Sequence, residues 1–373
     1  MGSVFQNKKT KLWSIRYDLP GSTRDDRKQK QVTGFNSKPE AASILKLLEA
    51  QIIKGEYDLV PKSFTVKELA DVWSENHFET LKPKTREYYK GMLNRYILPQ
   101  FGKVRANSLK KDDIESYYRQ LVKDGKSIDL VAKIHTLMRA LFYYSYEHDR
   151  IPSRIMDKVK RPTLKRDERE FWNIEERAKA IQYFKKNPVG YHVELVLLLG
   201  LRQGEVAGLK IEDIDFKAKT VKIRREAQML RNVGIHIDKP KTESSVRTLP
   251  LTSDAVKLLK SRISWIKENK LFYGPKYNYE WDGYLSVDEK GYLIHDQKIS
   301  GYYRRYMSRD DCPVKKITFH DIRHTFSVSL LERDVNLKTI QELLGHSNFS
   351  TTADIYSHVD LDKKREALNR LNG

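Results

Sequence analysis

Cysteine is nearly absent from this sequence of 373 residues, in which Cys312 is the single thiol. One cysteine excludes a disulfide framework and a cysteine-based zinc site, and it is typical of proteins made in a reducing compartment. The sequence also has no apolar run long enough to span a bilayer, and its N-terminus lacks an apolar secretory segment. We therefore expect a cytoplasmic protein that makes no use of a membrane.

Acidic residues are in deficit, with 50 of them against 70 lysines and arginines, so the net charge is +20. The excess runs along the whole chain: 11 basic against 7 acidic residues in 1–60, 22 against 13 in 61–165, and 37 against 30 in 166–373. A positive charge spread in this way indicates a protein that follows a polyanion, with an affinity that falls as salt rises. A generic basic protein is the alternative.

The length predicts two or three domains. Residues 11–19 and 29–35 are rich in β-favouring residues on either side of a Pro20-Gly21 turn, which predicts a small antiparallel sheet. Ser37 and Glu40 form a capping box for one helix behind it. We expect the open face of this 1–60 domain to bind DNA through Trp13, Arg16, Tyr17, Lys28 and Lys30. A module that only solubilises the chain is the alternative.

Residues 64–150 are expected to form an all-helical domain, because apolar residues recur at helical spacing in 66–76, 86–98, 110–122 and 128–147. Thr65 and Glu68 form a capping box at its start. The candidates for phosphate contacts on these helices are Lys82, Lys84, Arg86, Lys90, Lys126, Lys133 and Arg139, of which Lys84, Arg86, Lys133 and Arg139 are chosen as DNA-binding residues. A merely solvated face of each helix explains the same charges.

A proline-punctuated, charged stretch over 151–170 predicts a linker to a third domain, 165–373. There the patterns predict helices near 174–186, 192–199 and 253–268, strands near 220–225, 234–238 and 246–250, and helices from 298 onward. Residues 271–296, rich in Tyr, Gly and Asp, are an insertion to which the sequence assigns no role. The expected fold class is multidomain α+β: a small sheet plus helix, an all-α domain, and a mainly α domain with a small antiparallel sheet.

Two arginines, two histidines and a tyrosine in the last domain can together hold and attack a phosphodiester without a metal. Arg202 follows an apolar helix, and His320 and Arg323 share one face of a helix because they are three residues apart. Guanidinium groups match phosphate oxygens in pairs and stay charged. Tyr356 becomes a useful nucleophile where cations lower the pKa of its phenol.

Lys241, in a turn-rich segment between two short strands, and His346, after Leu344-Gly345, are further candidates. Several of these candidates also have a plain structural explanation. Arg202 can form a salt bridge to Glu205, Lys241 can be a solvated lysine at a hairpin tip, and His346 can be a local donor after the glycine that ends a helix. His320 and His324 stand at the spacing of a metal pair. That reading is weak because Arg323 lies between them and would repel a cation.

The order of these groups resembles that of the tyrosine recombinase (phage integrase) family. Leu201-Arg202-Gln203-Gly204-Glu205 resembles its first arginine box, His320-Asp321-Ile322-Arg323-His324-Thr325 its second, and Leu343-Leu344-Gly345-His346-Ser347 its histidine box; Tyr356 stands where the family has its nucleophile. Residues 1–60 resemble the arm-type DNA-binding domain of integrases from phages or integrative elements of Gram-positive bacteria. Residues 64–150 resemble the family's core-binding domain, and 165–373 its catalytic domain.

The resemblance implies strand exchange through a 3′-phosphotyrosine, with no cofactor and no metal. Tyr356 would attack; Arg202, Arg323 and His346 would hold the non-bridging oxygens; His320 would be the base and Lys241 the acid for the leaving 5′-hydroxyl. It also implies a homotetramer on double-stranded attachment sites, with core and arm sites, helped by an excision factor and a DNA-bending protein. The tail 357–373 would dock either on its own domain or on a neighbouring protomer.

Three other function classes compete with this one. A type IB topoisomerase shares the pocket but relaxes supercoils, and a sequence-specific DNA-binding protein would carry no chemistry. A metal-dependent nuclease or transposase would need a cation.

Overall fold

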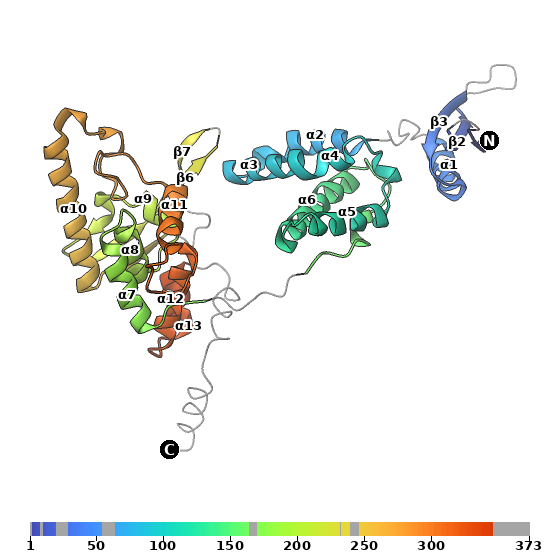
Figure 1. Cartoon of the computed structure of the whole chain (residues 1–373). Coiled ribbons are helices and arrows are strands. Elements are labelled where there is room, and N and C mark those ends of the chain that lie inside the picture. Colours follow the sequence, from blue (N-terminus) through green and yellow to red (C-terminus); the bar gives the residue numbers. More distant parts are fainter. Residues whose placement is uncertain are drawn as a thin grey trace, which may run out of the picture. The chain divides into compact units, whose positions relative to one another are not determined.

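The computed structural model describes residues 2–7, 10–19, 29–53, 64–163, 170–231, 233–238 and 246–345. The chain divides into two compact units, Met1–Arg166 and Asp167–Gly373 (Figure 1). Within these described ranges, no helix combines the length and the apolar character needed to cross a membrane.

The first unit begins with a three-stranded antiparallel sheet in the order β1-β2-β3: β1 (Ser3–Gln6), β2 (Trp13–Asp18) and β3 (Gln29–Phe35). Helix α1 (Lys38–Ile53) packs on it. Ile15 and Tyr17 of β2 share one small core with Ala41, Leu45 and Leu48 of α1. The predicted sheet and helix are confirmed, and β1 is an additional strand that the sequence patterns did not indicate.

The expectation that Trp13, Arg16, Tyr17 and Lys30 lie on one open face is wrong, because successive side chains of a strand point to opposite faces. Tyr17 is 2% exposed, and Trp13 packs against the same core, toward α1. Lys30 is the register partner of Tyr17 and so shares its face, with an exposed side chain. Arg16 points to the other face, where its guanidinium lies 5.1 Å from the centre of the Phe5 ring.

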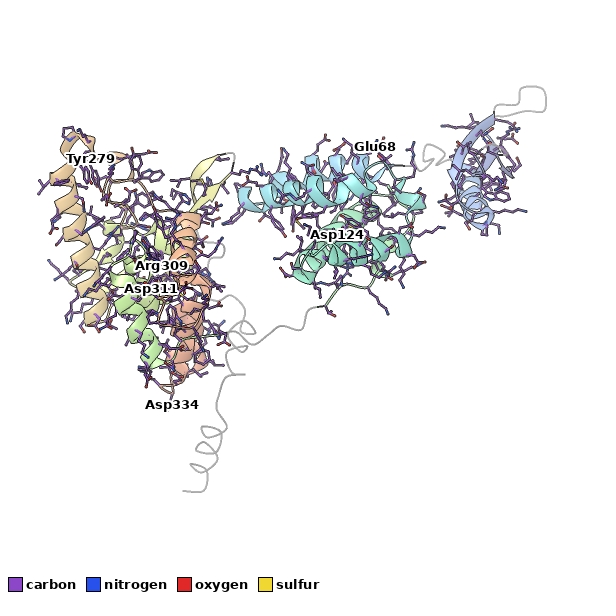
Figure 2. All side chains as sticks on the ribbon, viewed as in Figure 1. Glu68, Asp124, Tyr279, Arg309, Asp311 and Asp334 are labelled. Carbon is purple, nitrogen blue, oxygen red and sulfur yellow. The ribbon has the colours of Figure 1, made fainter. Side chains whose placement is uncertain are left out.

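Five helices follow in the first unit: α2 (Val66–His77), α3 (Pro83–Met92), α4 (Leu98–Phe101), α5 (Lys111–Lys123) and α6 (Ile128–Glu147). A π-helical turn over Leu93–Ile97 joins α3 to α4. The Thr65 backbone N–H donates to Glu68 Oε2 at 2.7 Å and the Glu68 N–H to Thr65 Oγ1 at 3.2 Å, so the predicted capping box starts α2 (Figure 2 labels Glu68). The apolar stripes read from the sequence fall on these helices and bury one core.

The second unit is mainly helical, with α7 (Ile174–Lys185), α8 (Gly190–Leu199), α9 (Gln203–Gly208), α10 (Ser253–Tyr273), α11 (Asp296–Met307), α12 (Phe319–Leu331) and α13 (Leu337–Leu344). Its strands form a three-stranded antiparallel sheet, β4 (Ile214–Asp215), β5 (Thr220–Ile223) and β8 (Arg247–Pro250), and a two-stranded hairpin, β6 (Glu226–Leu230) and β7 (Gly234–Asp238). This α+β architecture matches the expected fold class. Strands β4 and β6 were not predicted.

Helix α8 is apolar on nearly all sides because it lies in the middle of this unit, packed by α7, α10 and α12. It ends at Gly200, whose φ of 62° is left-handed. A side chain there would be strained, and a Cβ would come within 2.5 Å of the Phe326 ring on α12. Glycine thus allows α8 and α12 to approach closely, and this brings Arg202 and Arg323 into one neighbourhood.

Residues 271–296 are part of the core of the second unit and not a separate insertion. Leu285, Val287 and Leu293 are each at most 3% exposed. The segment is tied to the chain after α9, since the Leu285 N–H donates to Leu209 O at 3.0 Å. The composition hid this role, because a few apolar residues stand among many Tyr, Gly and Asp.

Candidate active site

A single buried carboxylate, that of Glu205, gathers three arginines from three distant parts of the chain. Arg202 donates to it twice, from its backbone N–H to Oε2 and from Nη1 to Oε1, both at 2.8 Å. Arg247 forms a bidentate pair, Nη1 to Oε1 at 2.9 Å and Nη2 to Oε2 at 3.0 Å. Arg323 Nη1 lies 3.9 Å from Oε2. The Glu205 side chain is fully buried, so these pairs are shielded from water.

The ionisation of the cluster follows from this geometry. Burial acts to raise the pKa of Glu205, but the hydrogen bonds and charge of Arg247, with Arg323 and Arg202, outweigh it and lower that pKa. Burial lowers the pKa of Arg323 to about 9, against the opposing effect of Glu205. Glu205 and Arg323 are therefore both charged near neutral pH. The carboxylate of Glu226 also acts on Arg323 and raises its pKa, so two acids face the three arginines.

The same three arginines hold the C-terminal end of α13 through three successive carbonyls. Arg247 Nε donates to Leu343 O at 2.8 Å, Arg323 Nη2 to Leu344 O at 2.6 Å, and Arg202 Nη2 to Gly345 O at 2.8 Å. The last carbonyls of a helix have no partner inside the helix and carry partial negative charge. The arginines supply both hydrogen-bond donors and positive charge to these carbonyls, and so hold the C-terminal end of α13.

Arg323 is also bonded to the end of α8, since its Nη1 donates to Gly200 O at 2.7 Å. Its side chain is 4% exposed, whereas that of Arg202 is 30% exposed. Arg323 is therefore locked between α8 and α13, while Arg202 keeps a solvent-facing edge. Both were predicted as phosphate-binding residues, and the structure brings them together around Glu205.

His320 is the second residue of α12, one turn before Arg323, and it is exposed. The helix begins with a capping box between Thr318 and Asp321, in which the Thr318 N–H donates to Asp321 Oδ2 at 2.9 Å. Asp321 is thus the second member of the capping box, with Thr318 as the N-cap. His324 is 8% exposed and its ring meets Phe171 edge to face, with the ring centres 6.1 Å apart. Over the described ranges, no group of three or more His, Cys, Asp or Glu could hold a metal ion.

Three of the six predicted catalytic residues, Lys241, His346 and Tyr356, lie outside the described residues, as does Lys28 of the predicted DNA-binding set. The other DNA-binding candidates, Lys84, Arg86, Lys133 and Arg139, are exposed on α3 and α6. Lys133 pairs with Asp129 at 2.6 Å and Arg139 with Asp157 at 3.6 Å.

Arg247 was missed in the sequence analysis although it contacts Glu205 more fully than Arg323 does. A signal was present. Residues 246–250 were predicted as a strand, and period-two alternation puts Arg247 on the same face as Leu249, which is 2% exposed. An arginine on the buried face of a strand needs a carboxylate partner. Its side chain is in fact 7% exposed.

The β6–β7 hairpin is fastened to the N-terminus of α11. Asp296 Oδ1 accepts the Met229 N–H at 2.8 Å, and Gln297 Nε2 donates to Met229 O at 3.1 Å. Gln203, next to Arg202, donates to the Asp296 carbonyl and to the Ser300 hydroxyl. The hairpin that leads into 239–245 is thus tied to the arginine cluster by way of α11.

Known proteins resemble this chain over most of its length. The model of the phage integrase family matches residues 172–363, and that of the phage integrase N-terminal SAM-like domain matches 65–122. The chain is 32% identical over 320 residues to the XerC-like tyrosine recombinase of Caldanaerobacter subterraneus subsp. tengcongensis, covering 78% of each chain. It is 26% identical over 306 residues to the transposase from transposon Tn916 of Enterococcus faecalis, covering 77% of this chain and 72% of that one.

Among solved structures, the Tn1549 transposon integrase in complex with transposon right end DNA superposes with a TM-score of 0.70. The match covers 83% of this chain and all of that one at 22% identity, so it shows a common fold. The family model covers more than half of the sequence, and the arginines that carry the motif resemblance surround one buried carboxylate. The chain belongs to the phage integrase family of tyrosine recombinases.

Proposed function

We propose that this recombinase cleaves and rejoins DNA at specific sites to integrate and excise a mobile element or prophage. The observation that carries the proposal is the pairing of Arg202 and Arg323 around Glu205, which leaves an excess of positive charge. Guanidinium pairs stabilise the charge that develops on the equatorial oxygens of a phosphoryl group in transfer.

In the proposed reaction the Tyr356 phenolic oxygen attacks the phosphorus and the bond to the 5′-oxygen breaks. His320 accepts the phenol proton, and Lys241 donates a proton to the leaving 5′-hydroxyl. Arg202, Arg323 and His346 hold the non-bridging oxygens. The 3′-phosphotyrosine ester keeps the energy of the broken bond, so attack by a 5′-hydroxyl of the partner strand reverses the step and completes the exchange.

Two features of the described residues support these roles. His320 is exposed at the first turn of α12, where substrate and solvent can reach its ring. The Gly345 carbonyl accepts from Arg202, so the C-terminal end of α13 lies at the arginine cluster. Glu205 and Arg247 act as positioning residues for the two substrate-binding arginines.

The remaining assignments follow the family. Residues 1–60 would bind arm sites, 64–150 would bind core sites together with the catalytic residues in 165–373, and four copies would act on two duplexes in the host cytoplasm. An excision factor and a DNA-bending protein would set the direction of the reaction.

Covalent trapping tests the chemistry. A duplex with a nick just beyond the cleavage position loses its short leaving fragment, so cleavage leaves the protein joined to DNA. Wild-type chain should form this adduct with EDTA present, and Tyr356→Phe should form none. Tyr292→Phe is a matched control, because Tyr292 is 53% exposed and lies elsewhere in the same unit. An adduct formed by Tyr356→Phe would exclude the proposed reaction. Loss of the wild-type adduct on adding EDTA would also exclude it.

A two-site assay separates this function from that of a topoisomerase. Two duplexes that carry attachment sites should give recombinant products, and a plasmid without such sites should keep its supercoils. Relaxation of that plasmid without recombinants would point to the topoisomerase.

A further inference from the structure

A basic depression lies within the first unit, between α6 and the chain that follows it. Its volume is about 390 Å³. Its floor is formed by His135, Met156 and Val159, which are 3%, 3% and 6% exposed. Its rim carries the exposed side chains of three arginines, Arg139, Arg154 and Arg161.

The charges of the rim are not balanced. Among the described residues that line the depression, Asp157 is the one acid, and it lies 3.0 Å from Arg154 Nε and 3.6 Å from Arg139 Nη2. Each guanidinium carries about five N–H donors, against roughly four acceptor positions on one carboxylate. The rim therefore has more donors than its one acid can accept, and an anion with several oxygens can take the others.

Arg154 is held in place before any ligand arrives. Its guanidinium carbon lies 4.9 Å from the centre of the Tyr143 ring and 5.9 Å from that of Tyr146, both on the last turns of α6. Stacking on two rings, together with the Asp157 contact, limits the rotamers of the side chain. Little conformational entropy is then lost when the fork binds an anion.

The floor of the depression carries no charge of its own. Burial lowers the pKa of His135, and the positive charges of Arg139 and Arg161 lower it further, so the ring is neutral near pH 7. His135 Nδ1 lies 3.3 Å from Tyr118 Oη, which fixes the ring.

We propose that this depression binds one phosphate of a DNA backbone, with Arg139, Arg154 and Arg161 as its ligands. A shallow, water-open site ringed by guanidiniums suits an oxyanion that stays attached to a chain, and it offers no apolar enclosure for a small organic molecule. The contact would position the helical part of the first unit on DNA without reading sequence. The inference rests on the proposed function only in that DNA is the ligand.

Salt dependence of DNA binding tests the site on the full chain. Each phosphate neutralised contributes about 0.9 to the slope of log K against log salt concentration. Arg154→Gln combined with Arg161→Gln should therefore reduce that slope by about 1, on specific and non-specific duplexes alike. An unchanged slope would overturn the proposal.

Arg309→Gln is the matched control. Arg309 stacks on Tyr306 at 5.4 Å and lies 4.0 Å from Asp311, so it has the same kinds of partner as Arg154 but lies in the second unit, outside the depression (Figure 2). The salt slope of DNA binding in the Arg309→Gln variant should equal that of wild type. Arg154→Lys with Arg161→Lys keeps the charges and should keep the slope; an equal loss in the lysine and glutamine variants would mean altered structure and refute a phosphate contact.

A local readout comes from His135, whose ring resonances can be followed by NMR after histidine labelling. Duplex DNA should shift them in wild type and leave them unmoved in the double glutamine variant. A shift with inorganic phosphate at matched ionic strength but none with duplex would mean that the site takes free phosphate, which contradicts the proposal. Covalent trapping does not depend on the salt slope or on the NMR shift. An unchanged salt slope therefore contradicts the phosphate site, whereas a missing covalent adduct contradicts the proposed reaction.

Discussion

Glu205→Gln is the substitution that probes the arginine cluster most directly. Glu205 is the carboxylate that Arg202 and Arg247 share at 2.8–3.0 Å, and Arg323 lies 3.9 Å away. Glutamine keeps the shape but removes the negative charge, and one of its two polar atoms becomes a donor that faces guanidinium donors. Breaking a buried pair in this way costs about 3–5 kcal/mol, because a buried charge is left without compensation.

Glu212→Gln is a control of the same residue type with the same kind of partners. Glu212 Oε1 accepts from Arg224 at 3.2 Å and from Arg225 at 2.8 Å, but its side chain is 58% exposed. Water screens this pair, and its loss should cost about 0–1 kcal/mol. Arg224 and Arg225 also keep a second carboxylate, since they donate to Asp213 at 2.6 and 2.5 Å. The comparison therefore contrasts a buried carboxylate that three arginines share with an exposed one whose arginines have another partner.

Native-state hydrogen exchange in increasing denaturant measures the effect in the second unit alone, through peptides from α8 and α12. The free energy of opening should fall by about 3–5 kcal/mol in Glu205→Gln and by at most about 1 kcal/mol in Glu212→Gln. Equal losses in the two variants would refute the view that Glu205 is the centre of a buried charge cluster.

Acid provides an internal check on the same variant. The pKa of Glu205 is lowered in the folded protein, so its contribution to stability is complete above the pKa of the unfolded chain and is lost as the pH falls through the folded value. The difference between wild type and Glu205→Gln should therefore shrink as the pH falls below about 4.5.

Three further predictions concern other residues of the second unit. Arg247→Lys keeps the charge but loses the bidentate fork, so suicide-duplex cleavage should slow while DNA affinity in a gel-shift assay stays within about threefold of wild type; an unchanged cleavage rate would remove Arg247 from the positioning role. Burial lowers the pKa of His192 to about 3; the unfolded chain then takes up its proton first, and this group should make folding stability, measured by denaturant titration, fall below about pH 6.5 by up to about 1.4 kcal/mol per pH unit, so the slope should be smaller by that amount in His192→Asn. Gly200→Ala should lower stability by at least about 1–2 kcal/mol because of its left-handed backbone and the Phe326 contact, whereas Gly301→Ala, with open space around it inside α11, should raise thermal stability by up to about 1 kcal/mol.

Local patterns along the chain predicted most elements because each depends on near neighbours. The capping box at Thr65, the left-handed glycine at Gly345 and the helical stripes of 64–150 all come from residues within a few positions of one another. Strands β1, β4 and β6 were not predicted; β4 has only two residues, too few to carry a periodic signal. The core role of residues 271–296 was not predicted, because the few apolar residues that reach the core stand among many Tyr, Gly and Asp.

The chemistry-bearing side chains and their order, the spread of positive charge and the two-fold alternation of strand faces are properties of the sequence itself. The contacts that those side chains make with one another are decided only by the tertiary structure. Arg323 bonds Gly200 across 123 residues, Arg202 bonds Gly345 across 143, and Arg247 joins them through Glu205. Hydrophobic burial packs α8, β8, α12 and α13 together. Only in that packed state do the arginines lie near the buried carboxylate of Glu205 and pair with it.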